Sequence, residues 1–257
     1  MVAQKDAGDA GDAGDAGDAR GEPEDARGEP EDQAGEAGEA VRTFCPVDPD
    51  SRQVRRRRTA RVLLVDDRER LLLFSDSDPG LPGLRWWITP GGGIEAGESD
   101  RKGAARELLE ETGLVTDPEA LIGPIARRRV RHGYTDVVVE QDEVFFGLRV
   151  APFDVDVAGH TEEERLTMTE HRWWTRDELV GTAETVWPVA LLELWARFDD
   201  RLANRLGDRL DDRLDNWPGG GPTGVDLGTQ EESTVPVGRR GARPSRPQDP
   251  ATPDGGL

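Results

Sequence analysis

Low-complexity sequence at both ends of the chain is the feature that most constrains its fold. Residues 1–41 repeat the triplet Asp-Ala-Gly from Asp6 and the heptad Ala-Arg-Gly-Glu-Pro-Glu-Asp from Ala19 and Ala26. This segment holds 13 acids and 3 bases and contains no aromatic residue. So little apolar surface cannot offset the entropy lost on folding. We predict a disordered acidic arm, which serves either as a solvating tail or as an interaction arm.

The C-terminal end is also low in complexity. Residues 217–257 contain 7 Pro and 9 Gly among 41 residues, a composition typical of disorder, and we predict a disordered tail there. In residues 199–216, leucines recur every fourth position, each preceded by an arginine, at Leu202, Leu206, Leu210 and Leu214. On a helix this spacing gives a narrow apolar stripe. The segment is interpreted as an amphipathic extension of the last domain helix or, alternatively, as a dimerising helix that would make the protein a homodimer.

The remaining segment, residues 42–198, has 157 residues and a net charge of −7, which suits one hydrophobic core. Apolar runs typical of strands lie at 59–65, 70–74, 86–88, 136–139 and 144–150. Helices are expected at 99–112, 177–179 and 188–198. Strands and helices alternate at short spacing, which predicts an α/β domain with a mixed sheet flanked by helices.

Charge and hydropathy exclude several classes of protein. The net charge of −20 opposes non-specific nucleic-acid binding, and an anionic small substrate would need a local cation. No apolar run has the length of a membrane span, and the N-terminus lacks the apolar stretch of a signal peptide. The single Cys45 excludes an intramolecular disulfide framework. We expect a cytoplasmic protein without a membrane partner.

One loop and the helix after it carry the candidate chemistry. Ser99 is a good N-cap, and Gly113 supplies the left-handed position that ends the helix. Between them Glu107, Glu110 and Glu111 stand at i, i+3 and i+4, so their carboxylates project from one face. Clustered carboxylates are the ligands that Mg²⁺ and Mn²⁺ prefer when substrate phosphates complete the shell. The alternative is a glutamate-rich surface helix, but glycines 91–93 before it allow close backbone approach to a ligand.

This stretch resembles the Nudix box of the Nudix (MutT-like) hydrolases, G-x5-E-x7-R-E-U-x-E-E-x-G-U with U aliphatic. All nine defined positions match: Gly92, Glu98, Arg106, Glu107, Leu108, Glu110, Glu111, Gly113 and Leu114. The resemblance extends over residues 58–198. It implies a Nudix-type α/β/α sandwich that hydrolyses the diphosphate linkage of a nucleoside diphosphate joined to another moiety, with Mg²⁺ or Mn²⁺.

The resemblance also implies roles for individual residues. The divalent ions would be bound by Glu107, Glu110 and Glu111. Arg106 would orient these carboxylates through salt bridges. Glu98 would hold the joint between loop and helix and contribute to the outer metal shell, while Gly92 would let the loop approach the substrate. The general base varies within the family, and we favour Glu110 or Glu111 over Glu143, which precedes an apolar strand.

A basic cluster after the box is the candidate phosphate clamp. It contains Arg127, Arg129 and Arg131, with Arg128 and His132 between and beside them. Alternation along a strand would direct half of these side chains away from any one site. The tryptophans present a similar choice, between core packing and stacking on a nucleobase.

The resemblance to the Nudix family does not specify the substrate. The proline and tyrosine that mark the subfamilies for ADP-ribose and dinucleoside polyphosphates are not met, since Pro124 comes too early and Tyr134 too late. A nucleoside triphosphate, an oxidised nucleotide, ADP-ribose or a nucleotide sugar all remain candidates. The rival function is a non-catalytic Nudix-fold nucleotide sensor. An isomerase on this fold is a weaker rival because Cys45 lies far before the box. We also expect deletion of residues 1–41 and 218–257 to leave activity intact.

Overall fold

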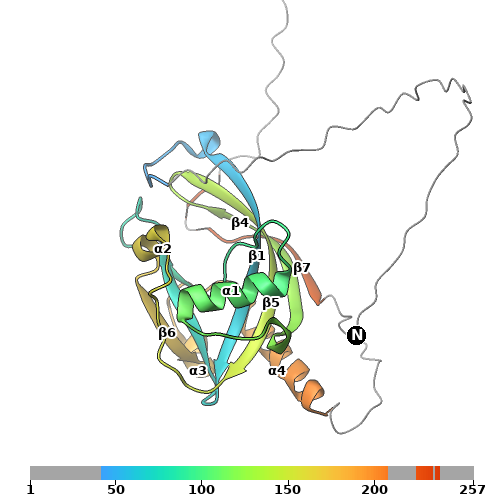
Figure 1. The fold of residues 1–257 in the computed structure, drawn as a ribbon. Coiled ribbons are helices and arrows are strands. Elements are labelled where there is room, and N and C mark those ends of the chain that lie inside the picture. Colours follow the sequence, from blue (N-terminus) through green and yellow to red (C-terminus); the bar gives the residue numbers. More distant parts are fainter. Residues whose placement is uncertain (1–41, 208–223, 234, 238–257) are drawn as a thin grey trace, which may run out of the picture. The chain divides into compact units, whose positions relative to one another are not determined.

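A mixed β-sheet forms the centre of the domain. The computed structural model describes residues 42–207, 224–233 and 235–237. In these residues seven strands form one sheet in the order β3-β2-β1-β5-β4-β7, and β6 pairs with β2 (Figure 1). The β1–β5 and β4–β7 pairs are parallel, and the other pairs are antiparallel. The strands are β1 (Gln53–Asp66), β2 (Arg70–Ser77), β3 (Arg85–Ile88), β4 (Ile122–Gly133), β5 (Val137–Val150), β6 (Glu170–Thr175) and β7 (Val225–Glu231).

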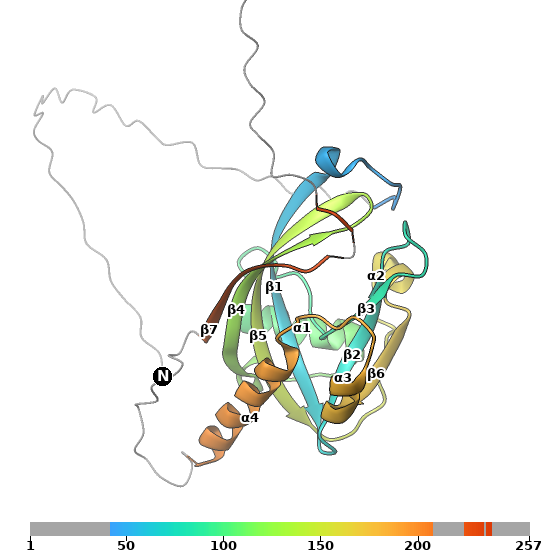
Figure 2. The same cartoon turned by 180° about the vertical axis from the view of Figure 1, so that it is seen from behind.

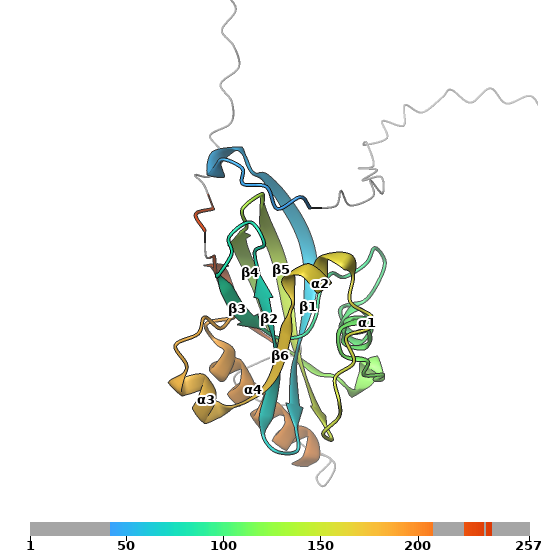
Figure 3. The ribbon, with the colours of Figure 1, turned by 90° about the vertical axis from the view of Figure 1, so that its left-hand side faces the viewer.

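Helices cover both faces of this sheet. Helix α1 (Asp100–Thr112) lies on one side, and α3 (Arg176–Gly181) and α4 (Leu191–Gly207) lie on the other (Figure 3). Helix α2 (Glu162–Thr167) precedes β6, and short 3-10 helices lie at Pro49–Ser51 and Pro118–Ala120. The predicted α/β/α sandwich is therefore confirmed. Among the described residues, no helix combines the length and hydropathy required to cross a membrane.

Strand alternation divides the hydrophobic core into two layers. On β1, Val62 and Leu64 pack with Ala104 and Leu108 in a layer on the α1 side, which we call the α1-side core. Their neighbours Leu63 and Val65 pack with Phe145, Leu194, Trp195 and Phe198 in the α4-side core. Each large apolar side chain buried this way contributes about 1.5–3 kcal/mol. Trp86, Trp87, Trp174 and Trp195 are all buried, so the structure favours core packing for them over base stacking.

Strands β1 and β5 are both much longer than the sequence predicted. The acidic run at 140–143 interrupts the apolar pattern, so we expected two strands at 136–139 and 144–150 where there is one, β5. Its acids lie opposite arginines of both neighbouring strands. Glu140 faces Arg56 of β1, and Asp142 faces Arg129 of β4. Opposite charges directly across a sheet stabilise the pairing. Strand β1 likewise begins at Gln53, before its expected start at residue 59, and pairs with β5 along this extension.

The predicted tail contains a strand. Strand β7, inside residues 217–257, pairs in parallel with β4 at the end of the sheet (Figure 2). Leu227 packs against the α4-side core, and Val235 and Val237 are buried. The prediction of disorder is wrong for this segment because composition averaged over 41 residues conceals a short run that folds through backbone pairing. The other residues of the predicted tail, and the predicted arm at 1–41, are not among the described residues.

Helix α4 runs through the boundary that we placed between residues 198 and 199. Leu191, Leu194, Trp195 and Phe198 are buried, and Leu202, the first leucine of the predicted stripe, packs against the α4-side core. At least this part of the stripe therefore serves the domain's own core. Leu210 and Leu214 lie outside the described residues, and a dimer stays a prediction.

Candidate active site

The helix that carries the three glutamates is capped as the sequence predicted. The Ser99 side chain accepts a hydrogen bond from the Lys102 amide at 3.3 Å. Gly113 is left-handed, with φ of 72°, and its amide donates to the carbonyl of Leu109 at 2.9 Å. Both ends of α1 are thus capped by the residues that the sequence indicated.

Glycines let that loop lie against β1 and against the helix. The amide of Ala60 donates to the Gly92 carbonyl at 3.0 Å, and the amide of Val62 donates to the Pro90 carbonyl at 2.9 Å. Gly91 has φ of 124°, and a Cβ there would lie 2.1 Å from the Ala60 carbonyl oxygen. A Cβ on Gly92 would lie 2.4 Å from Oε2 of Glu107. Gly91 therefore lets the loop lie against β1, and Gly92 lets the Glu107 carboxylate approach the loop backbone.

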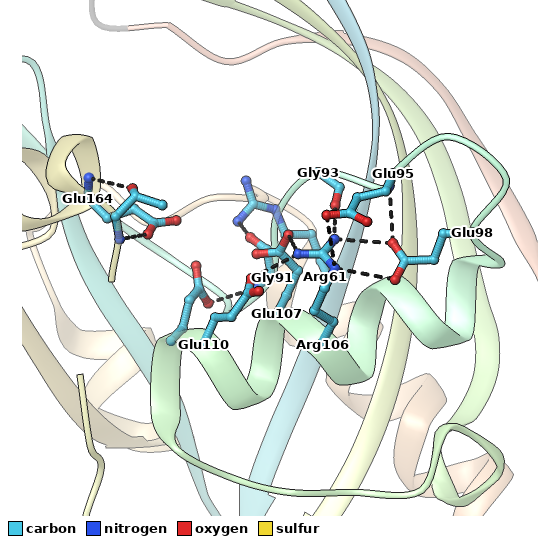
Figure 4. A network of polar contacts seen from close by, with 11 residues as sticks. Arg61, Gly91, Gly93, Glu95, Glu98, Arg106, Glu107, Glu110 and Glu164 are labelled. Atoms are coloured by element: carbon cyan, nitrogen blue, oxygen red, sulfur yellow. Dashed lines mark hydrogen bonds and ion pairs between the residues drawn. The ribbon is translucent and has the colours of Figure 1, made fainter. Parts of the chain in front are cut away.

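Arg106 ties the loop to the glutamates (Figure 4). Its guanidinium lies 2.8 Å from a carboxylate oxygen of Glu107, 2.8 Å from one of Glu110 and 3.1 Å from one of Glu98. It also donates to the carbonyl of Gly93 at 2.6 Å. Burial opposes ionisation of Glu98, but the hydrogen bonds from Arg106 and from the Glu95 amide lower its pKa below the ordinary value. Glu98 thus holds the joint between loop and helix in this structure.

Three carboxylates meet beside α1. Glu107, Glu111 and Glu164 each offer an oxygen within 4.8 Å of the others, and Glu107 and Glu111 are buried. Burial raises the pKa of Glu111 to about 8, against the opposing charge of Arg61 and the amide of Gly91, which donates to Glu111 at 2.7 Å. Burial also raises the pKa of Glu107, against Arg106. Carboxylates crowded this way repel one another unless a proton or a cation lies between them.

The donor set fits a hard divalent cation. All three groups are carboxylates, the ligands of Mg²⁺ and Mn²⁺, and the described residues add no thiolate or imidazole to the cluster. A cation between them would neutralise the repulsion among the three carboxylates. Glu107 and Glu111 therefore stand where the sequence predicted a metal site.

Glu110 lies outside this cluster. Its carboxylate pairs with Arg106, and its side chain is 45% exposed. It faces solvent at the edge of the site because it precedes the buried Glu111 by one position on the helix.

Glu143 lies in a different environment from the glutamate cluster. Its neighbours on β5, Val144 and Phe146, belong to the α1-side core, so Glu143 points to the opposite face. There its carboxylate lies 2.7 Å from Arg128 and 3.4 Å from Arg61. Glu143 therefore stabilises buried arginines in this structure.

The arginines of β4 separate by face, as alternation requires. Arg127, Arg129 and Arg131 lie on the α1 side and pair with Asp100, Asp142 and Glu140 respectively. Arg58, Arg127 and Arg129 line a pocket of about 470 Å³ near the N-terminus of α1. Arg128 pairs with Glu143 on the opposite face of the strand and is buried, although both residues also border this pocket. Arg127, Arg129 and Arg131 thus lie on the α1 side of the sheet, and the first two share the pocket.

Comparison with known proteins identifies the family. A family model described as the NUDIX domain matches residues 55–194, more than half of the chain. The chain is a member of the Nudix hydrolase family. A relative named RNA pyrophosphohydrolase, from Erythrobacter litoralis, is 31% identical over 148 residues, which cover 51% of this chain and 82% of the relative. As the family implies, this Nudix hydrolase is an enzyme that acts on pyrophosphate bonds.

Solved structures also resemble this Nudix hydrolase. A MutT protein from Methanosarcina mazei Go1 matches with a TM-score of 0.38 and 21% identity, covering 58% of this chain and 96% of that one. An Ap4A hydrolase from C. elegans matches with a TM-score of 0.40 and 18% identity, covering 58% of this chain and 98% of that one.

Sequence reasoning missed two residues of the site. Glu164 joins the glutamate cluster from α2, where it forms a capping box with Thr161. The pattern Thr-x-x-Glu at 161–164 signals such a helix start, although nothing local directs it to the metal site. Arg61 of β1 donates to the carbonyls of Thr89 and Gly91 in the loop. An arginine inside an apolar strand pattern was the available signal for a buried charge.

Proposed function

We propose that Glu107, Glu111 and Glu164 hold Mg²⁺ or Mn²⁺ and that this Nudix hydrolase cleaves the diphosphate linkage of a nucleoside diphosphate derivative there. The observation that carries the proposal is the convergence of three carboxylate oxygens within 4.8 Å, two of them on buried side chains. A bound divalent ion supplies charge neutralisation at the diphosphate and a more acidic water.

The protein's own residues orient and activate the reactants. Arg106 holds Glu107 and Glu110 on one side and Glu98 on the other, so the carboxylates need little reorganisation when a ligand binds. Among the three candidates for general base, Glu111 is buried in the cluster and Glu143 is enclosed between two arginines. Glu110 is exposed, and we assign it as the residue that accepts the proton of the attacking water.

The exposed arginines of β4 supply a phosphate-binding surface in this proposal. Arg127 and Arg129 pair with Asp100 and Asp142 at the protein surface, where such pairs contribute about 0–1 kcal/mol. An incoming phosphate can therefore exchange with the carboxylates and bind the planar guanidinium groups through two hydrogen bonds. Arg131 is less accessible because its side chain is mostly buried.

The relatives differ in the substrates that their names state, which are RNA for one and Ap4A for another. Nucleoside triphosphates, oxidised nucleotides, ADP-ribose, nucleotide sugars and dinucleoside polyphosphates share the linkage and define the panel to test. A cytoplasmic location remains part of the proposal.

Hydrolysis of this panel tests the proposed function. Release of phosphate, with added pyrophosphatase and phosphatase, is measured with Mg²⁺, with Mn²⁺ and with EDTA. We expect metal-dependent cleavage of at least one group, and a strong loss in Glu111→Gln. Cleavage that persists in EDTA would contradict the metal site. Stabilisation by a nucleotide without cleavage would favour the alternative, a nucleotide sensor.

A further inference from the structure

A continuous series of buried contacts joins the C-terminal segment to the glutamate cluster. Glu232 lies 2.7 Å from the guanidinium of Arg128, which lies 2.7 Å from Glu143. Glu143 lies 3.4 Å from Arg61, which donates to the carbonyl of Gly91. The amide of Gly91 in turn donates to Glu111 at 2.7 Å. We call Glu232, Arg128, Glu143 and Arg61 the buried charge series.

The members of this series are shielded from water. The side chains of Arg128, Glu143 and Glu232 are each 5% exposed or less. In such an environment each charge depends on its neighbours, because solvent cannot replace a lost partner. Loss of one charge therefore leaves its buried neighbour uncompensated, which favours a shift of that neighbour.

Besides its ion pair with Arg128, Glu232 makes two further contacts. Its other carboxylate oxygen accepts from the amide of Val189, just before α4, at 2.9 Å. Its own amide donates to the carbonyl of Arg131 at 3.2 Å. Nearby, Ser233 accepts from the amide of Gly133 at 2.9 Å. The segment that follows β7 thus presents Glu232 to Arg128 in one defined orientation.

At the other end of the series, Arg61 sets the position of the loop. It donates to the carbonyls of Thr89 and Gly91, on either side of Pro90. Figure 4 shows Arg61 and Gly91 beside the glutamates of α1. A displaced Arg61 would release this loop and with it the amide that orients Glu111.

We propose that Glu232 is a positioning residue for the metal site, acting through Arg128, Glu143 and Arg61 on Gly91 and Glu111. The C-terminal segment is then part of the catalytic module, although it lies far from the Nudix box in sequence. This inference rests on the proposed function, because it assumes that Glu111 binds the divalent ion.

Metal affinity without substrate tests the inference directly. Mn²⁺ binding to the full chain is measured by electron paramagnetic resonance for wild type, Glu232→Gln and the control Glu231→Gln. Glu231 is exposed, so its variant makes the same change of charge one residue away. We expect Glu232→Gln to weaken Mn²⁺ binding about three- to tenfold, less than the loss of a direct partner of a ligand. The control should match wild type.

The outcomes separate the two proposals. Measured at a temperature where all three proteins are folded, equal Mn²⁺ affinity in Glu232→Gln and Glu231→Gln would overturn the role of Glu232 alone. A wild-type protein that binds no Mn²⁺ would overturn the metal site of the proposed function, and the role of Glu232 with it.

Hydrogen exchange in wild type supplies a test that needs no variant. Coupling between two sites is reciprocal, so metal bound at Glu111 must stabilise the docking of the C-terminal segment. We expect Mn²⁺ to slow amide exchange in peptides that cover residues 225–232, with α3 as an unaffected control. Protection confined to residues 90–112 would contradict the inference.

Discussion

Two adjacent arginines of β4 offer a sharp test of how burial sets the contribution of an ion pair. Arg128 is 4% exposed and lies between Glu143 and Glu232, whereas Arg129 is 61% exposed and pairs with Asp142. The substitutions Arg128→Met and Arg129→Met remove the same charge and keep a similar aliphatic stem. They therefore differ mainly in the face of the sheet on which the charge is lost.

The expected magnitudes follow from these environments. Removing one partner of a buried pair costs about 3–5 kcal/mol. Glu143 keeps Arg61, and Glu232 keeps the amide of Val189, so we place the loss for Arg128→Met near the lower end, at about 3 kcal/mol. Loss of the exposed pair in Arg129→Met should cost about 0–1 kcal/mol.

Urea unfolding followed by tryptophan fluorescence measures both free energies, and equal m-values would show that the variants unfold from comparable states. In a domain of this size we expect Arg128→Met to unfold roughly 6–12 °C below wild type. Similar losses in the two variants, or a larger loss in Arg129→Met, would refute the assignment of these side chains to opposite faces.

Three further predictions address the site and its surroundings. Gly92→Ala places a methyl group against Glu107, so hydrolysis should fall by at least tenfold with little change in melting temperature; an active variant would contradict this close approach. Burial lowers the pKa of His132 to about 3, so the unfolded chain alone gains a proton below pH 6.5 and stability falls from there towards pH 3. When the pH is lowered from 7.5 to 5, the free energy of unfolding, measured with urea, should fall by about 2 kcal/mol less in His132→Phe than in wild type. An identical fall in both proteins would show that His132 does not cause it. Deletion of 238–257 should preserve Mn²⁺ binding and hydrolysis, whereas deletion from residue 224 should weaken both. This replaces our expectation that the whole tail is dispensable for activity, and equal activities of the two truncated proteins would restore it.

The Nudix box was readable from sequence because its information is local. The spacing of Glu107, Glu110 and Glu111 places them on one helical face, and Ser99 and Gly113 define the ends of that helix. Periodicity and capping operate within a few residues, so they survive in any tertiary context that accepts the helix. The sandwich could be predicted for a related reason, since the continuous apolar runs of β1 and β2 must be covered on both faces of a sheet.

Contacts between distant segments were beyond the reach of such patterns. Glu164 joins the glutamate cluster from α2, although no local pattern indicated it. Glu110 matches the spacing of the box but pairs with Arg106 outside the cluster. The register of β4 against β5 determines which of the four neighbouring arginines is buried. A shift of one residue would exchange the buried and exposed faces of the strand. Strand β7 escaped detection because its stability comes from pairing with β4 rather than from its own composition.

The sequence by itself therefore determined the helix, the loop glycines and the carboxylates that define the family. Only the tertiary structure decided which carboxylates converge and which charges are buried, including the contact of the C-terminal Glu232 with Arg128. The physical reason is that periodicity determines the face on which a side chain lies, whereas the partner that it meets there depends on strand register and on segments far away along the chain.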